Sequence, residues 1–319
     1  MKFTIRQLEY FIATAETGSI TLASARVNIS QPSISTAISH LEREFGVQLF
    51  IRHHAQGLSI TAAGRALLRE ARELVRKADN LYSTTADSAQ NVRGVLSVGC
   101  MLTLAPVVMP ELSQSFAKSY PEAEVRQSSF HQEDLLEALR RGDIDVGLTY
   151  DLDLASDIAF VPLVDLPPHA VCGASDPLRR RKVVTLKELA ARPLILLDLP
   201  MSRGYFLSLF LKENLSPTIL ARSPHADVVR SMVGNGHGYT LFNARPRCEL
   251  ALDGTRLHRV RIAGSQPPMV LGIATLKQAQ KTRIVQAFEG HCRQMISEAH
   301  IPGMAPLATS RPRAARRPA

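Results

Sequence analysis

Residues 18–46 constrain the fold more than any other stretch, because they place two short helical patterns on either side of a tight break. Ser30 is positioned to cap the second pattern, with its hydroxyl accepting a hydrogen bond from a first-turn backbone N–H. Pro32 then falls in that first turn, where a missing donor does no harm. One apolar stripe follows at helical spacing and predicts a buried helix face, formed by Ile34, Ile38, Leu41 and Phe45.

The two patterns together predict a helix–turn–helix unit. In the first, Leu22, Ala23 and Val27 are expected to face inward. The outer side of the second carries small, uncharged polar residues, namely Gln31, Ser33, Ser35, Thr36 and Ser39. Such short side chains can approach a base edge closely, as the second helix of a helix-turn-helix motif does in the major groove. The alternative is an ordinary two-helix corner in an all-α domain.

The segments on both sides extend this unit. Thr4 and Gln7 form a capping-box pattern for a first helix, which ends at Gly18. Downstream, β-prone residues at 47–51 and 58–61 flank a turn around Gly57, which predicts a β-hairpin wing. The wing residues expected near a phosphate backbone or minor groove are Arg52, His53, His54 and Gln56.

A long helix is predicted from residue 61 to about 89, because this stretch holds no proline and no glycine after Gly64. Small and apolar residues recur along it at alternating spacings of four and three, at Leu67, Ala71, Leu74, Ala78, Leu81, Thr85 and Ser88. This heptad seam predicts pairing with a second copy of the chain. A two-fold dimer would then present two recognition helices to the two half-sites of a pseudo-palindromic operator. The alternative is a helix packed on its own domain.

Beyond residue 94 the pattern changes to alternating strands and helices, which favours parallel sheets with helical crossovers. Two such series follow each other, joined by segments expected to cross between halves near 158–164 and 260–265. In the second series we expect a helix over residues 205–212. A further helix is expected over residues 278–299, at the end of the fold. From residue 301 onward Pro, Ala and Arg dominate, and we expect a disordered basic tail.

The N-terminal segment resembles the winged helix-turn-helix of LysR-type transcriptional regulators. The similarity rests on LEYF, AETGS, SQPSIS, LEREFGVQLF and LSITAAG in this order. It implies DNA contacts by Gln31, Pro32, Ser33, Ser35 and Thr36, and by Arg52 in the wing. It also implies an effector domain with the two-lobed fold of periplasmic binding proteins. Thr36 and Ala55 stand where this family often carries arginine, which puts its usual base preferences in doubt.

The predicted fold class is therefore multidomain α+β, with an all-α winged domain, a linker helix and a two-lobed α/β domain of the type 2 periplasmic-binding kind. We expect the winged DNA-binding domain over 1–61 and the dimerisation helix over 62–91. The effector domain is expected over 92–300 and the tail over 301–319. Within the effector domain, lobe I is expected to comprise 94–162 and 264–300, and lobe II 163–263.

A ligand is expected outside the carboxyl ends of the strands, between the two halves. That rule selects loop residues by position, namely Cys100, Met101, Leu102, Thr103, Ser129, Phe130, Thr149, Tyr150, Ser202 and Arg203. A free helix start near Thr103 and the pair Ser202–Arg203 favour an organic anion. Asp151 would repel an anion if it lined the cleft, and would then suit a ligand with an amine or hydroxyl.

Composition excludes several other classes of protein. The net charge is +9, but residues 1–61 hold five basic and four acidic side chains. The excess of positive charge therefore comes from outside the predicted DNA-binding segment and is no evidence for DNA binding. The four cysteines are far apart, without a CxxC pair, so neither a zinc knuckle nor a disulfide framework is predicted. Neither a signal-peptide core nor a run of 18 apolar residues is present, which predicts a cytoplasmic chain that does not enter the membrane.

Three functional hypotheses remain at this point. The first is a ligand-responsive transcription factor without metal or cofactor. The second, a cysteine-redox-switched regulator, would need a reactive pair among Cys100, Cys172, Cys248 and Cys292. The third, an enzyme on an α/β scaffold, finds no support in the motifs, since GxSxG, HExxH and nucleotide-binding loops are absent from the sequence.

Overall fold

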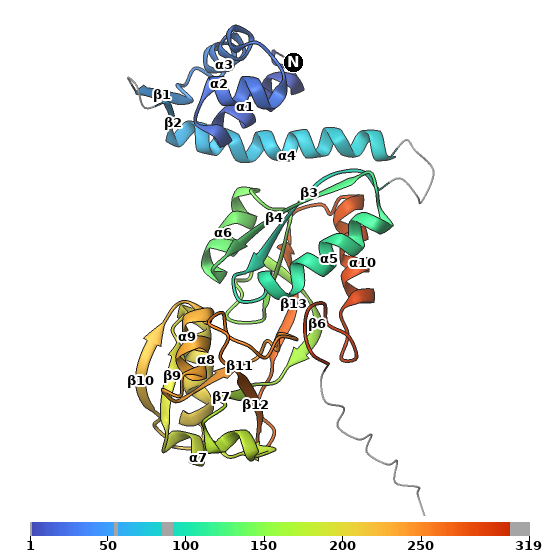
Figure 1. The fold of residues 1–319 in the computed structure, drawn as a ribbon. Coiled ribbons are helices and arrows are strands. Elements are labelled where there is room, and N and C mark those ends of the chain that lie inside the picture. Colours follow the sequence, from blue (N-terminus) through green and yellow to red (C-terminus); the bar gives the residue numbers. More distant parts are fainter. Residues whose placement is uncertain (1, 54–56, 85–91, 307–319) are drawn as a thin grey trace, which may run out of the picture. The chain divides into compact units, whose positions relative to one another are not determined.

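The computed structural model describes residues 2–53, 57–84 and 92–306 (Figure 1). In the last part of the linker helix, side chains are described only through residue 75 and at residue 78. The chain divides into two compact units, residues 1–94 and 95–319. Among the described residues, no helix is both long and apolar enough to cross a lipid bilayer.

The first unit begins with three short helices, α1 (Ile5–Thr17), α2 (Ile20–Val27) and α3 (Gln31–Phe45). The capping box at Thr4 and Gln7 is confirmed, since each side chain bonds the other residue's backbone N–H. Gly18 ends α1 with a φ of 62°, a left-handed conformation that suits glycine. The three helices share one core with the wing, built around Leu8, Phe11, Ile34, Ile38, Leu41, Leu49 and Phe50.

Three expectations within the helix pair are wrong. Leu22 is 58% exposed, because Ala23, one position further round the short helix, takes the inward place. Phe45 lies in the last turn of α3, beyond the core, where it is exposed and packs against Phe3 at 5.4 Å between ring centroids. The Ser30 hydroxyl does not cap α3; it bonds the Ser33 hydroxyl at 2.8 Å instead.

The wing consists of β1 (Phe50–His53) and β2 (Gly57–Ile60), paired antiparallel as predicted. Its second strand is tied to the turn between α1 and α2, where the Leu58 backbone N–H donates to the Gly18 carbonyl at 2.8 Å. The predicted wing residues His54, Ala55 and Gln56 lie outside the described residues.

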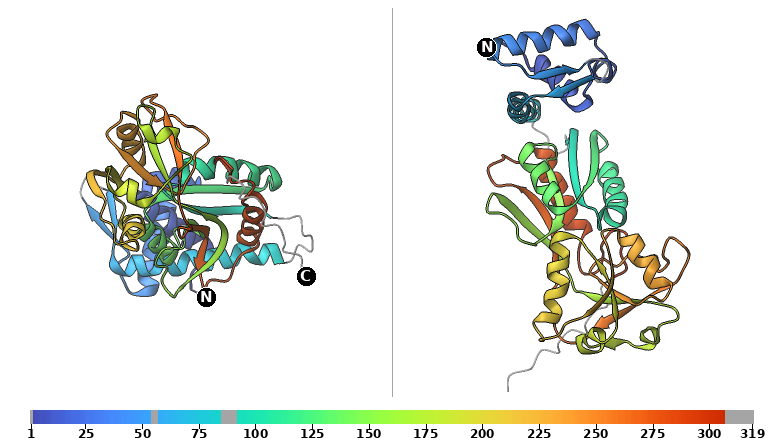
Figure 2. Two further views of the ribbon diagram at one scale, coloured as in Figure 1. Left: turned by 90° about the horizontal axis from the view of Figure 1, so that it is seen from below. Right: turned by 90° about the vertical axis from the view of Figure 1, so that its left-hand side faces the viewer.

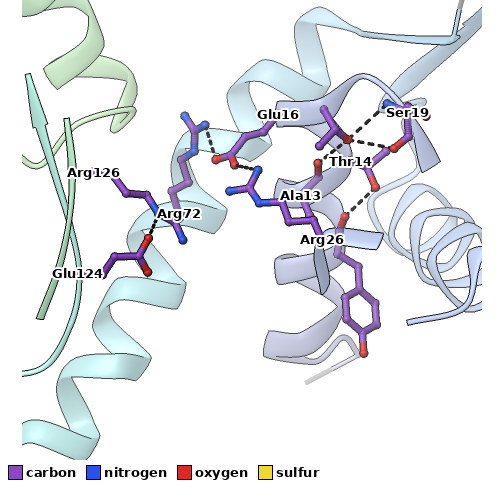
Figure 3. A network of polar contacts seen from close by, with 10 residues as sticks. Ala13, Thr14, Glu16, Ser19, Arg26, Arg72, Glu124 and Arg126 are labelled. Carbon is purple, nitrogen blue, oxygen red and sulfur yellow. Dashed lines mark hydrogen bonds and ion pairs between the residues drawn. The ribbon is translucent and has the colours of Figure 1, made fainter. Parts of the chain in front are cut away.

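The linker helix α4 (Ala62–Thr84) packs on the winged domain through its first half. Ala71 is buried in the shared core, with Leu67, Leu68 and Val75 against it. Glu16 in α1 also links the three helices, because its carboxylate forms ion pairs with Arg26 of α2 at 2.6 Å and with Arg72 of α4 at 2.9 Å (Figure 3).

This packing corrects the predicted seam. Ala71 is buried against the helix's own domain, because α1 packs on that side of α4, so it is not available to a second copy, and Leu67 is partly buried in the same core. Leu74 is 37% exposed and remains available. The seam residues Thr85 and Ser88 lie outside the described residues.

The second unit has two lobes, which Figures 1 and 2 show as separate sheets with their own helices. Lobe I holds a five-stranded sheet in the order β4-β3-β5-β13-β6. Its strands are β3 (Gly94–Met101), β4 (Ala123–Phe130), β5 (Val146–Tyr150), β6 (Ile158–Leu166) and β13 (Met269–Leu276). Its helices are α5 (Ala105–Ser119), α6 (Gln132–Arg141) and α10 (Arg283–Met295).

Lobe II holds a six-stranded sheet in the order β10-β9-β11-β7-β12-β8. Its strands are β7 (His169–Gly173), β8 (Val183–Val184), β9 (Pro193–Leu197), β10 (Thr218–Ser223), β11 (Tyr239–Phe242) and β12 (Leu257–Ile262). Its helices are α7 (Leu186–Ala190), α8 (Pro200–Leu211) and α9 (Ala226–Gly234), with a 3₁₀ turn η1 (Pro177–Arg180). The predicted α/β alternation is confirmed in both lobes.

The first predicted crossing segment is wrong in position, and the second, near 260–265, is correct only in its last three residues. Residues 158–166 form β6, which pairs along β13 inside lobe I, so the chain crosses at 167–168. It returns after β12, at 263–268. A strand at the edge of a sheet and a segment that crosses between lobes are both short and apolar. The sequence pattern alone therefore does not distinguish them.

The end of the chain also differs from expectation. Helix α10 is shorter than predicted, because the Thr282 hydroxyl caps it and it ends at Met295. Residues 301–306 were expected in a disordered tail, yet Ile301 and Met304 are buried. Met304 pairs with Pro246 of lobe II, while the Gly303 backbone N–H donates to Glu111 of α5 at 2.9 Å. This segment therefore connects the two lobes.

Candidate DNA interface and ligand cavity

Helix α3 has a polar, solvent-facing side opposite a buried apolar side. Its inner residues Ile34, Ala37, Ile38 and Leu41 are buried, which fixes the rotation of the helix about its axis. The face predicted to contact DNA is solvent-accessible: Gln31, Pro32, Ser33, Thr36 and Ser39 are exposed and Ser35 is partly buried. A shallow hollow at the start of this face is lined by Ile20, Ser24, Ser30, Gln31, Pro32 and Ser35.

Gln31 is held by a neighbouring helix. The Thr21 hydroxyl of α2 donates to its Oε1 at 3.3 Å, which leaves the amide N–H₂ without a partner among the described residues. A side-chain amide with a free N–H₂ can donate to an acceptor on a base edge in the major groove. The structure thus presents Gln31 in a conformation suited to base contact.

The wing displays its first strand to solvent. Arg52 is exposed, opposite Leu58 in the register, and adds a positive charge that the face of α3 lacks. His53 is exposed too, with its Nε2 and the Ser59 hydroxyl 2.8 Å apart across the hairpin. One cationic and one polar side chain thus stand on a hairpin that shares the core of α3, an arrangement suited to phosphate contact.

The second unit contains a cavity of ≈ 250 Å³ between the two lobes. Lobe I supplies the end of β3 and the start of α6, and lobe II supplies the end of β9 and the start of α8. The lining residues are Met101, His131, Gln132, Glu133, Asp134, Asp198, Leu199, Pro200, Met201, Ser202 and Pro224. The cavity thus lies where the carboxyl ends of strands from both sheets meet, as the rule for open α/β sheets predicts.

The lobe II end of the cavity is formed by the first turn of α8. This helix starts at Pro200, earlier than the sequence suggested, so Ser202 and Arg203 lie inside it. Ser202 is buried and lines the cavity. Arg203 instead donates to Asp198 at 2.8 Å, and Arg222 approaches the same carboxylate at 3.8 Å. Because Asp198 holds Arg203, the predicted anion clamp is not formed.

The lobe I end is formed by the first turn of α6. Gln132 is 4% exposed, and its Nε2 donates to the Leu152 carbonyl at 2.5 Å. Its Oε1 has no hydrogen-bond partner in the described parts of the chain. Glu133 and Asp134 follow, both exposed and both lining the cavity. The strand-end rule selects residues only as far as Phe130, where β4 ends, and α6 begins two residues later, so the sequence did not predict this turn.

The predicted ligand residues are only partly brought together. Met101 and Ser202 line the cavity, and the other eight lie outside its lining, at Cys100, Leu102, Thr103, Ser129, Phe130, Thr149, Tyr150 and Arg203. Thr149 and Tyr150 are buried in β5, where burial raises the pKa of the Tyr150 hydroxyl well above its usual range. Asp151 is exposed and does not line the cavity.

The cysteines and potential metal ligands form no reactive cluster in the described residues. Cys100, Cys172 and Cys292 are buried and Cys248 is exposed, all four as free thiols. Burial raises the pKa of the Cys172 thiol to about 11, and raises the pKa of Cys100 and Cys292 further. These three side chains therefore stay protonated at neutral pH and are unreactive, because the thiolate is the nucleophilic form of cysteine. No group of three His, Cys, Asp or Glu residues in the described parts is placed to hold a metal ion.

Comparison with known proteins agrees with both halves of this description. Residues 5–65 match the family described as bacterial regulatory helix-turn-helix protein, lysR family, and residues 89–297 match the LysR substrate binding domain. The chain belongs to the LysR family of transcriptional regulators. It is thus a DNA-binding regulator with an effector-binding domain, and the resemblance in its motifs is confirmed.

Individual LysR-family proteins are similar over nearly the whole chain. The regulator YybE of Bacillus subtilis is 28% identical over 301 residues, 92% of this chain and 99% of its own. The crystal structure of HinK from Pseudomonas aeruginosa is 38% identical with a TM-score of 0.63, covering 92% of this chain and 98% of that one. Full-length CbnR complexed with its target DNA is 27% identical with a TM-score of 0.56, covering 92% and 99%.

Proposed function

We propose that this LysR-family regulator reads an operator through Gln31, Pro32, Ser33, Ser35 and Thr36, with Arg52 and His53 on the flanking backbone. The observation that carries the proposal is the exposed, uncharged polar face of α3, fixed in rotation by its buried inner face. The CbnR relative was solved with its target DNA, which supports the same docking mode for this chain. The regulator would act in the cytoplasm, where bacterial operators are.

We further propose that the cavity between the lobes is the effector site. It lies where the two lobes of the effector-binding domain meet, and both lobes contribute a helix start to it. A ligand that contacts both lobes favours the arrangement in which they are close, so its binding shifts the balance between two states of the protein. This regulation requires no chemical turnover, and no enzyme activity is proposed.

Two-fold assembly is the third part of the proposal. A dimer through the later part of α4, from Leu74 onward, places two copies of α3 on two half-sites, and a tetramer doubles that arrangement. Leu74 supports this dimer. Its apolar side chain lies at a seam position and is left exposed by its own domain, so it can pack against a second copy of the chain.

The test begins with selection of binding sites from a random DNA pool by the purified full-length protein. Gln31→Ala is expected to weaken binding to the selected operator by about 1–3 kcal/mol while leaving non-specific binding nearly unchanged. Gln286→Ala, an exposed glutamine on α10, is the matched control and should bind like the parent. Equal losses on operator and random DNA would show that Gln31 does not read sequence, and an unenriched pool would contradict operator recognition itself.

A further inference from the structure

We propose that the effector is a small amphoteric molecule that carries a protonated amine and a carboxylate on a short apolar body. This inference rests on the proposed role of the cavity as the effector site. It differs from the organic anion expected from sequence, because the two ends of the cavity carry opposite electrostatic character.

The α6 end is negative. Glu133 and Asp134 line it, and neither makes an ion pair with a described residue. Both lie in the first turn of α6, where their charges already offset the positive end of the helix dipole. An additional carboxylate from a ligand would meet two like charges here, whereas an ammonium group would be attracted to them.

Gln132 gives an independent indication of a donor at this end. Its Nε2 is committed to the Leu152 carbonyl, so the orientation of the amide is fixed and the remaining atom is an acceptor. That acceptor, Oε1, is buried and has no partner among the described residues, although Gln132 lines the cavity. Buried acceptors are normally satisfied, so a ligand N–H at this position completes the site.

The α8 end has the opposite character. No acidic residue lies in the first turn of α8, and no side chain from the part of the chain that the structure describes caps its start. The first-turn N–H groups, including that of Ser202, have no acceptor within the helix and favour an anion. The Ser202 side chain is 4% exposed and lines the cavity, which places a hydroxyl donor beside them.

The charge of Asp198 does not cancel this positive character. Asp198 lines the cavity and the two arginines do not, but its carboxylate is paired with Arg203 at 2.8 Å and approached by Arg222 at 3.8 Å, so the three side chains together carry a net charge of +1. A ligand carboxylate at α8 therefore meets a helix start, a hydroxyl donor and a net positive neighbourhood.

The space between the two ends is apolar and small. Its apolar lining residues are Met101, Leu199, Pro200, Met201 and Pro224. The volume of ≈ 250 Å³ lies below the lower limit of about 300 Å³ that is typical of sites for drug-sized ligands. Because the two ends belong to different lobes, a ligand with both charges binds both lobes, and a ligand with one charge satisfies only one.

The experiment measures binding to the full-length protein by titration calorimetry and thermal shift. The probes are the ω-amino acids from 3-aminopropanoate to 6-aminohexanoate, each with the n-alkylamine and the alkanoate of the same chain length. At the best-fitting length, the amino acid is expected to bind about tenfold or more tightly than either single-charge analogue. An alkanoate that binds as tightly as the amino acid would overturn the inference.

Variants then assign the two ends. The double variant Glu133→Gln, Asp134→Asn should weaken binding of the amino acid and strengthen that of the alkanoate, because it removes the like charges at α6. Glu137→Gln, on the same helix but outside the cavity lining, should change neither. Ser202→Asp should reverse the preference toward the alkylamine, because it places a carboxylate at the start of α8.

The outcomes separate this inference from the proposed function. If alkanoates bind best and the double variant has no effect, the cavity remains the effector site but takes anions. If no ω-amino acid binds at any chain length, the amphoteric inference is wrong as stated. Operator selection and the Gln31→Ala measurement depend on neither result, so failure of the proposed function would be seen there.

Discussion

The Glu42 carboxylate in α3 accepts a hydrogen bond from the Leu49 backbone N–H at 2.8 Å. The Phe50 N–H approaches the same oxygen at 3.3 Å, so one side chain holds the start of the wing against the recognition helix. Leu49 itself is fully buried in the shared core. The relative placement of α3 and the wing, and hence of Gln31 and Arg52, depends in part on this contact.

Replacing Glu42 tests that contact. Glu42→Ala leaves the N–H of Leu49 without its acceptor and is expected to destabilise the winged unit by about 1–3 kcal/mol. Glu42→Gln keeps an oxygen acceptor and should lose clearly less. Denaturant unfolding followed by circular dichroism measures both, and equal losses in the two variants would show that the charge, rather than the hydrogen bond, matters.

Arg52 is expected to contribute to DNA affinity without contributing to sequence preference. Arg52→Ala should weaken operator and random DNA alike and reduce the slope of log K against log salt by about 0.9, the amount for one phosphate contact. Arg52→Lys keeps the charge and should retain the slope. A loss confined to the operator would instead assign Arg52 to a base contact in the minor groove.

The corrected seam predicts where α4 meets a second copy. Charges introduced together as Leu74→Glu and Leu81→Glu should dissociate the dimer and lower operator affinity, because the two half-sites are then bound independently. Ala66→Glu, an exposed position earlier on the same helix, serves as control and should stay dimeric. Sedimentation decides the matter: a double variant that remains dimeric places the subunit contact elsewhere.

His169 predicts how stability depends on pH. Burial first, and then Arg245 and Arg259, lower the pKa of this β7 histidine from 6.5 to about 3. The unfolded chain therefore takes up a proton at this histidine below pH 6.5, while the folded chain does not. The contribution of His169 to the free energy of unfolding is thus fully present above pH 6.5. It is lost at about 1.4 kcal/mol per pH unit as the pH falls toward 3.

The comparison is between variants across that window. His169→Gln removes the titrating group and should flatten the decline in unfolding free energy between pH 6 and pH 4. His237→Gln, at an exposed histidine of the same lobe, should leave the slope of the parent. An unchanged slope in His169→Gln would mean that this residue is solvated when protonated.

Local signals in the sequence were sufficient to place the helices and the wing of the first unit. The capping box at Thr4, the glycine at Gly18 and the apolar stripe of α3 each act within a few residues, and the structure shows all three elements. Leu22 and Phe45 were misplaced because their burial depends on what the other elements cover, and helical spacing alone does not state this.

The cavity was predicted in place but not in composition. Strand ends marked the correct edge of each sheet, and Met101 and Ser202 followed from that rule. Glu133, Asp134 and Asp198 lie within a few residues of the strand ends, yet which of them line the cavity depends on how two separate sheets meet. The pairing of Arg203 with Asp198 likewise depended on where α8 begins.

The sequence by itself determined the family, the alternation of elements in both lobes and the polar face of α3, because these follow from periodicity, caps and ordered motifs. The tertiary structure alone decided that Ala71 faces its own domain, that Met304 packs beside Pro246, and that the starts of α6 and α8 line one cavity. The reason is that these features depend on contacts between residues distant in the chain, whose meeting is set by the packing of whole helices and sheets.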